Sequence, residues 1–213
     1  MGETVAEHWS RVYETKKTEE VSWYQPSAEV SLALVAESGV PASTAVVDVG
    51  AGASTFVDGL LDRGFSDVTL LDLAAPALEA TRARLGARAA GLTTVVGDVT
   101  AWSPPKSYRL WHDRAVFHFL VEPDQRAAYR EVLGRALAPD GMAIVATFAA
   151  DGPEKCSGLP VCRYSIEALA EELSPVLELV GSRAAVHTTP WGSSQSFVFG
   201  LFRRRLPPGP KGV

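Results

Sequence analysis

The sequence predicts an α/β fold with a doubly wound, mainly parallel β-sheet. Three short apolar runs, each typical of a buried parallel strand, cover residues 45–49, 68–71 and 93–96. Helical patterns lie between them, and a glycine turn joins the first run to the next helix. Because the carboxyl ends of parallel strands meet at one edge of a sheet, the polar residues that follow these runs should gather there.

The first run and its turn form the element around which the chain is organised. Residues 45–49 are followed by Gly50-Ala51-Gly52, and a helix is predicted from Ser54 to a stop at Gly64. Glycine removes side chains that would block a ligand from the backbone, and a helix N-terminus offers free N–H groups. This order of strand, turn and helix is typical of a nucleotide-binding element.

Acidic residues follow the second and third runs. Asp72 lies 20 residues after Gly52, where a carboxylate can accept hydrogen bonds from ribose hydroxyls. Asp98 follows Gly97 one strand further along, within reach of a base. Thr55 occupies the place of the third glycine in the dinucleotide fingerprint, so a NAD-type oxidoreductase remains an alternative at this point.

The order Asp48-Val-Gly-Ala-Gly, Asp72 and Gly97-Asp98 resembles the motifs of class I S-adenosylmethionine (SAM) methyltransferases. The resemblance implies a Rossmann-like sheet of seven strands with an antiparallel C-terminal strand. It implies SAM as cofactor and S-adenosylhomocysteine as product. SAM has no pyrophosphate, so the missing glycine counts less against SAM than against NAD. The implied cofactor-binding residues are Asp48, Gly50, Ala51, Gly52, Ser54, Asp72, Leu73, Asp98, Val99, His112 and Trp23.

The N-terminal segment, residues 1–26, is rich in aromatic side chains, among them Trp9, Tyr13, Trp23 and Tyr24. Trp and Tyr bury a large area yet keep a polar group, which suits a cover that excludes water. We expect a lid over the cofactor; the alternative is an arm whose rings pack on the core. Ser27 is expected to cap the following helix, which ends at Gly39.

The remaining elements follow from proline, glycine and the apolar pattern. Pro76 is expected in the first turn of a helix that buries Leu78 and Leu85. The further expected elements are a strand at 108–114, a helix from Pro123 that ends before 139–141, a strand at 142–148, a long loop at 149–163, a short helix capped by Ser165, and strands near 176–187 and 195–204.

Three stretches are expected to form the acceptor side of the site: residues 112–114 after the fourth strand, the loop at 156–164, and the turn at 187–195. The candidate bases are Asp113, His112 and His187, in that order. The candidate acceptor-binding residues are Trp23, Tyr24, Arg114, Arg163 and Trp191. The alternative for Asp113 and Arg114 is an ion pair that holds the loop.

Two subfamilies are similar beyond the cofactor motifs. Trp111-His112-Asp113-Arg114 resembles the thiopurine methyltransferases, and residues 156–164 with the helix that follows resemble the tellurite-resistance methyltransferases. These resemblances imply a small-molecule acceptor with a sulfur, nitrogen or oxygen nucleophile. The N-terminal aromatic residues resemble the elongation-factor-lysine methyltransferases, so a protein acceptor is the alternative. A SAM-binding module without turnover is the non-enzymatic alternative.

Composition limits the other possibilities. With 213 residues, we expect a single domain over residues 1–206 and a flexible tail at 207–213. The net charge of -5 offers no basic face to nucleic acid, and no apolar stretch or leader predicts a membrane or secretory protein, so we expect a cytoplasmic monomer or homodimer. The 2 cysteines, expected as free thiols, and 4 histidines lack metal-site spacing, so no metal is expected.

Overall fold

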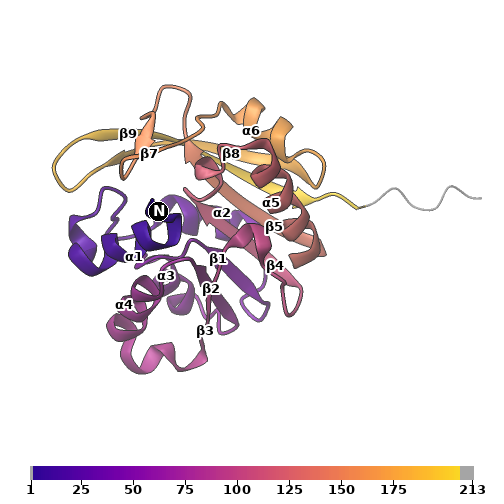
Figure 1. Ribbon diagram of the computed structural model, residues 1–213. Helices are drawn as coiled ribbons and strands as arrows, with labels where there is room; N and C mark the ends of the chain where they lie inside the picture. Colours follow the sequence, from indigo (N-terminus) through magenta and orange to yellow (C-terminus); the bar gives the residue numbers. More distant parts are fainter. Residues whose placement is uncertain (1, 207–213) are drawn as a thin grey trace, which may run out of the picture.

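The computed structural model of the chain describes residues 2–206, so the expected tail at 207–213 lies outside the described residues. Its main sheet has seven strands in the order β3-β2-β1-β4-β5-β9-β8, with β9 antiparallel to both of its neighbours (Figure 1). The strands are β1 (Val46–Val49), β2 (Val68–Asp72), β3 (Thr93–Val96), β4 (Tyr108–Arg114), β5 (Leu137–Phe148), β8 (Leu177–Thr188) and β9 (Ser194–Arg204). The predicted fold class is confirmed.

Helices cover both faces of this sheet. The α-helices are α1 (Val5–Thr15), α2 (Glu29–Ser38), α3 (Phe56–Asp62), α4 (Ala75–Leu85), α5 (Pro123–Ala136) and α6 (Ile166–Leu173). The 3₁₀-helices are η1 (Thr18–Glu20), η2 (Gly86–Gly91), η3 (Val99–Ala101) and η4 (Phe117–Phe119). Apolar side chains of α2, α3 and α4 form one core cluster, and those of α5 and α6 form the other. Successive strand residues alternate between the two clusters, as the pleat requires.

The alternation is clearest in β1 and β4, the two strands at the centre. Val46 and Leu110 belong to the α2–α3 cluster, whereas Val47 and Trp111 belong to the α5–α6 cluster. Both strands are buried along nearly their whole length, which explains their near-continuous apolar sequence. Helix α1 lies outside these two layers and packs against α4 (Figure 1).

Three local expectations are corrected. Strand β5 begins at Leu137 and not at Met142, because Leu137 pairs with Tyr108 before an irregularity in the ladder. Ala28, and not Ser27, is the N-cap residue of α2, and it makes no side-chain capping bond. The expected loop at 149–163 contains a two-stranded hairpin, β6 (Lys155–Cys156) and β7 (Leu159–Pro160).

A chain of buried polar side chains joins the central strands to α2. His112 Nδ1–H donates to Asp48 Oδ1 across the β4–β1 pair at 2.6 Å, and His112 Nε2 lies 2.9 Å from Ser31 Oγ. All three residues are 2% exposed, and the imidazole stacks on Phe56 of α3 at 3.8 Å between ring centroids. Buried carboxylates need such partners, so this network fixes β1, β4, α2 and α3 to one another.

The network predicts a strong loss of stability in a single variant. His112→Leu leaves the Asp48 carboxylate buried without its donor, so the free energy of unfolding should fall by about 3–5 kcal/mol in urea titrations. The double variant Asp48→Leu/His112→Leu removes both polar groups and should cost less than the sum of the two single variants. Strictly additive costs would show that the two side chains do not depend on each other.

Candidate active site

A cavity of about 490 Å³ opens at the carboxyl ends of β1, β2, β3 and β4. Four separate strand ends, helix α1 and the β6–β7 hairpin contribute to its wall. The lining residues are Val5, Ala6, Trp9, Tyr13, Trp23, Val49, Gly50, Leu71, Asp72, Leu73, Gly97, Asp98, Val99, Thr100, Arg114, Ala115, Val116, Phe119, Leu120, Gln125 and Cys156. Ligands of open α/β sheets bind at this edge, so this cavity is the candidate site.

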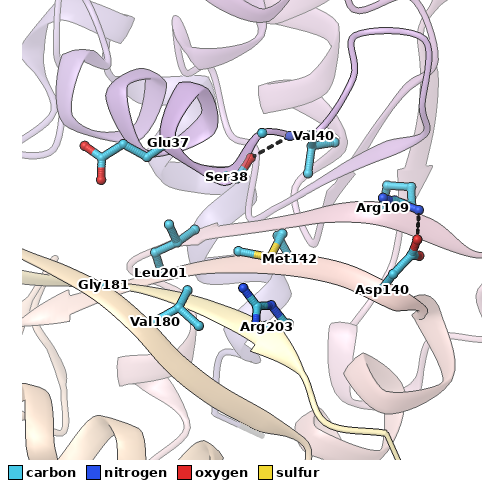
Figure 2. A pocket seen from close by; sticks show the side chains of 11 residues that line it. Glu37, Ser38, Val40, Arg109, Asp140, Met142, Val180, Gly181, Leu201 and Arg203 are labelled. Atoms are coloured by element: carbon cyan, nitrogen blue, oxygen red, sulfur yellow. Dashed lines mark hydrogen bonds and ion pairs between the residues drawn. The ribbon is translucent and has the colours of Figure 1, made fainter.

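A second hollow of about 440 Å³ lies at the opposite edge of the sheet (Figure 2). Its wall includes Arg109 at the start of β4, Met142 in the middle of β5, and Arg203 near the end of the antiparallel β9. Arg109 is ion-paired with Asp140 there, as the dashed line in Figure 2 marks. This hollow lies beside the amino end of β4, and none of the predicted site residues lines it.

The Asp72 carboxylate ties the glycine turn to the end of β2. Its Oδ2 accepts the Gly52 N–H and its Oδ1 accepts the Ala74 N–H, both at 2.8 Å. Thr81 Oγ1 donates to the Gly52 carbonyl from α4 at 3.0 Å. Burial raises the pKa of Asp72 to about 6, although these amide bonds oppose the shift. The carboxylate keeps lone pairs free for further donors from the cavity that it lines.

Both glycines of the turn have a left-handed backbone. The φ angles are 63° at Gly50 and 53° at Gly52, a region that side chains disfavour. A Cβ at Gly50 would lie 2.0 Å from Val116 Cγ2, and a Cβ at Gly52 would lie 2.4 Å from Tyr13 Oη. The glycines are therefore required by the chain's own packing, and the Tyr13 hydroxyl reaches the turn directly.

The N-terminal segment covers the cavity and is fixed by long-range bonds. Trp23 Nε1 lies 3.3 Å from Tyr13 Oη, and the Trp23 carbonyl accepts from Arg114 Nη1 at 3.1 Å. His187 Nε2 donates to the Ser22 carbonyl at 2.6 Å, and Thr55 Oγ1 donates to the Gln25 carbonyl at 3.1 Å. Three remote parts of the fold therefore hold residues 22–25 in place.

The sequence of the central strands matches a known family. Residues 46–141 match the family model described as a methyltransferase domain. The stretch covers β1 to the start of β5, which includes the four strand ends that form the cavity. The seven-stranded sheet with one antiparallel strand is the class I arrangement. Residues 46–141 therefore resemble a methyltransferase domain, and they lie within a sheet of the class I arrangement.

Solved structures share the fold at low sequence identity. The 1,6-didemethyltoxoflavin-N1-methyltransferase of Burkholderia thailandensis is 22% identical, covers 92% of this chain and 81% of its own, and has a TM-score of 0.68. The N-methyltransferase NodS of Bradyrhizobium japonicum WM9 is 13% identical, with coverages of 93% and 100% and a TM-score of 0.67. A putative methyltransferase in complex with the activator Trm112 of Haloferax volcanii is 15% identical, with coverages of 93% and 98% and a TM-score of 0.74. No curated protein sequence matches the chain.

The cavity fits SAM, the cofactor of this class. Asp72 and Asp98 present carboxylates at neighbouring strand ends, the positions where a ribose and an adenine amino group would donate. Gly50 and Gly97 line the wall without side chains, so the ligand can approach the backbone there. When bound, SAM supplies an activated methyl group. The described residues contain no cluster of His, Cys, Asp or Glu that could hold a metal.

The cofactor-binding residues expected from the sequence fall into two groups. Those that line the cavity are Gly50, Asp72, Leu73, Asp98, Val99 and Trp23. Ala51, Gly52 and Ser54 lie in the turn behind them: the Ala51 N–H donates to the Leu71 carbonyl, and Ser54 Oγ accepts the Phe56 N–H. Asp48 and His112 belong to the buried network with Ser31 and do not reach the cavity, which corrects their expected contact with the cofactor.

The expected base positions are also corrected. Asp113 is 0% exposed; its Oδ1 accepts the Val116 N–H at 2.8 Å, and its Oδ2 accepts the Phe117 N–H at 3.1 Å and the Tyr129 hydroxyl at 2.7 Å. It holds the backbone turn after β4 and does not pair with Arg114. The imidazole of His187 is hydrogen-bonded to the Ser22 carbonyl. Neither side chain lines the cavity.

Of the expected acceptor-binding residues, Trp23 and Arg114 line the cavity and three do not. Trp191 is 61% exposed in the β8–β9 turn. Arg163 donates to the Gly152 carbonyl and to Glu154. Tyr24 is partly buried in the loop beside Trp23, outside the lining.

Several lining residues were not expected from the sequence. Val116, Phe119 and Leu120 reach the cavity because Ala115 has a φ of 73°, which turns the chain back over the end of β4. The signal that could have found them is the apolar run directly after the fourth strand. Trp9 and Tyr13 lay within the expected lid without an assigned contact. They face the cavity from successive turns of α1.

The raised pKa of Asp72 predicts a pH-dependent cofactor affinity. The ionised carboxylate accepts hydroxyl donors more strongly than the acid does. The pKa of about 6 means that the group protonates as the pH falls through 6, so SAM binding should weaken about tenfold between pH 7.5 and pH 5. Calorimetric titration across this range measures the change.

Asp72→Asn provides the control for this measurement. Asn cannot ionise, so its SAM affinity should be about tenfold weaker or more at pH 7.5 but should vary little down to pH 5. The same pH slope in the wild type and in the variant would assign the titration to another group.

Asp113→Asn tests the structural assignment of that residue. The amide has only one oxygen to replace two, so donors in the turn lose partners and the free energy of unfolding should fall by about 1–3 kcal/mol. Tyr129→Phe should also lower the free energy of unfolding, but by a smaller amount. SAM affinity should stay within about twofold in both. Full stability combined with a large loss of turnover would restore Asp113 as the base.

Proposed function

We propose that this domain methylates a small-molecule acceptor inside the cavity that α1 covers. The main support for this proposal is the set of side chains that form the cavity wall opposite the cofactor side. Trp9, Trp23 and Phe119 contribute aromatic rings to it, with Trp9 packed edge-on against both others at 5.5 and 5.2 Å. A covered pocket with apolar walls and few polar groups is typical of a small-molecule site.

The wall does not suit the alternative, a lysine side chain of a protein. A cationic acceptor requires carboxylates near the methyl group, whereas the carboxylates of the lining are Asp72 and Asp98 on the cofactor side. Arg114 is the cationic side chain among the lining residues, and it donates to the carbonyl of Trp23, so it would repel a lysine there. The Burkholderia thailandensis enzyme, whose structure contains bound 1,6-didemethyltoxoflavin, supports the same preference by analogy of fold.

The chain's contribution to methyl transfer is binding, orientation and exclusion of water. With an activated methyl donor, alignment of the nucleophile matters more than acid–base catalysis, so positioning supplies much of the rate acceleration. None of the carboxylates and imidazoles expected as bases faces the acceptor side, since Asp113, His112 and His187 are bonded elsewhere. The acceptor therefore enters with its nucleophile already neutral or anionic.

The N-terminal segment serves as the cover in this proposal. Its α1 begins with a capping box of Thr4 and Glu7, so it is a stable helix and not a loose arm. Tyr13 reaches the glycine turn and Trp23 closes the side of the cavity. Movement of this segment would admit cofactor and acceptor.

The test is a reaction of the purified protein with methyl-labelled SAM and a cell lysate, which is then separated into protein and small-molecule fractions. We expect the label in the small-molecule fraction. Label confined to protein would support the lysine alternative. Tight SAM binding without transfer into either fraction would identify a SAM-binding module. The same reaction with Asp72→Asn controls for chemistry outside this site.

A further inference from the structure

The side chain of Arg114 has two donors that nothing in the described chain uses. Arg114 is the last residue of β4 and lines the cavity. Its Nη1 donates to the Trp23 carbonyl, but Nε and Nη2 are buried without a hydrogen-bond partner. Among residues 2–206, no carboxylate forms an ion pair with it. Buried guanidinium donors are normally hydrogen-bonded, so two unpaired donors on a side chain that lines a cavity indicate a missing partner.

The two open donors lie on one edge of the guanidinium. Nε–H and one Nη2–H point in parallel, which is the geometry that receives both oxygens of a carboxylate. The guanidinium lies over the Phe197 ring, with Cζ 4.8 Å from the ring centroid. The bond to Trp23, the ring of Phe197 and the turn at Ala115 therefore hold the guanidinium in one orientation.

The groups around Arg114 supply no negative charge. Burial raises the pKa of the Cys156 thiol to about 11, so the thiol is neutral at physiological pH. Burial and the nearby guanidinium lower the pKa of His118 to about 3, and they also lower that of His187, which keeps both rings neutral. Burial lowers the pKa of Arg114 itself to about 10, which leaves it protonated. Asp72 and Asp98 line the same cavity, but within residues 2–206 neither forms an ion pair with Arg114, so its guanidinium has no paired counter-charge there.

We propose that the acceptor is a carboxylate-bearing small molecule whose carboxylate is bound by the Nε and Nη2 edge of Arg114. The inference rests on the proposed function and names its substrate class. The apolar body of the acceptor lies against Trp9 and Phe119, and its nucleophile points toward the cofactor side. The carboxylate supplies the charge that the guanidinium lacks, in a site removed from water where a charge-assisted pair is strong.

A purely structural role makes a different prediction. If Arg114 only fixes the N-terminal segment through the Trp23 carbonyl, its loss would weaken the binding of neutral and anionic ligands alike. A carboxylate site instead couples Arg114 to the charge of the ligand. Matched ligands that differ only in that charge therefore separate the two roles.

The binding experiment uses benzoate and benzamide with the protein saturated in S-adenosylhomocysteine. Wild type should bind benzoate about tenfold more tightly than benzamide, because only the carboxylate pairs with both open donors. Arg114→Met should remove this preference and leave benzamide affinity within about twofold. Arg114→Lys keeps the positive charge but loses the two parallel N–H donors, so it should keep part of the preference for benzoate. Affinity for S-adenosylhomocysteine in each variant reports whether the cover is intact.

Arg163→Met is the matched control. This arginine donates to the Gly152 carbonyl and to Glu154 outside the cavity, so its loss should leave the benzoate preference unchanged. Equal binding of benzoate and benzamide by wild type, or no binding of benzoate, would overturn the inference. So would a preference that survives Arg114→Met, or a loss of both ligands together in that variant.

A second measurement separates this inference from the proposed function. The small-molecule fraction of the lysate is divided on an anion exchanger and tested with labelled SAM. Transfer of the labelled methyl group into the retained, anionic fraction supports both the proposed function and the anionic acceptor. Transfer only into the unretained fraction keeps the proposed function and overturns the anionic acceptor. Transfer only into protein overturns the proposed function, and the benzoate preference still decides whether Arg114 forms a carboxylate site.

Discussion

The carboxylate of Asp72 joins the two strand ends on which the cofactor side depends. By accepting the Gly52 and Ala74 amides, it fixes the glycine turn against the end of β2 and the start of α4. The turn in turn sets the position of the α3 N-terminus and of the Tyr13 hydroxyl above it. A single buried carboxylate thus orders the wall of the cavity and remains available to a ligand. Its raised pKa is the cost of that position.

Most other polar side chains near this edge serve the fold. Asp48, His112 and Ser31 link the central strands to α2, and Asp113 with Tyr129 holds the turn after β4. A polar residue near a strand end looks the same in the sequence whether its side chain points across the sheet or out of its edge. In β4, His112 points into the α2–α3 layer, Asp113 bonds to Tyr129 of α5 on the other face, and only Arg114 lines the cavity. One step along the strand decides between a structural and a binding role.

This distinction explains how far the sequence could lead. The fold and the strand-end acids follow from local patterns: an apolar run, then a glycine or an acid, then a helix. The acceptor side depends on contacts between remote segments, such as Tyr13 with the glycine turn and His187 with Ser22. Such contacts leave no period or spacing in the sequence. Trp191 was expected to line the pocket only because it carries a large aromatic ring, yet its side chain is exposed at a hairpin turn.

The electrostatics of the cavity constrain how an acceptor can lie in it. Transfer of a methyl group from a sulfonium to a neutral or anionic nucleophile disperses positive charge, and a dry site without a base favours a nucleophile that needs no proton removed. A cation beside the nucleophile would stabilise its lone pair and slow its attack on the methyl group. Arg114 is therefore best used on a group distant from the reacting atom. Its place at the end of β4, with one donor on the Trp23 carbonyl of the cover, meets that condition. In the proposed site, the anion would be bound against the cover, and the nucleophile would lie toward the strand ends proposed to bind the cofactor.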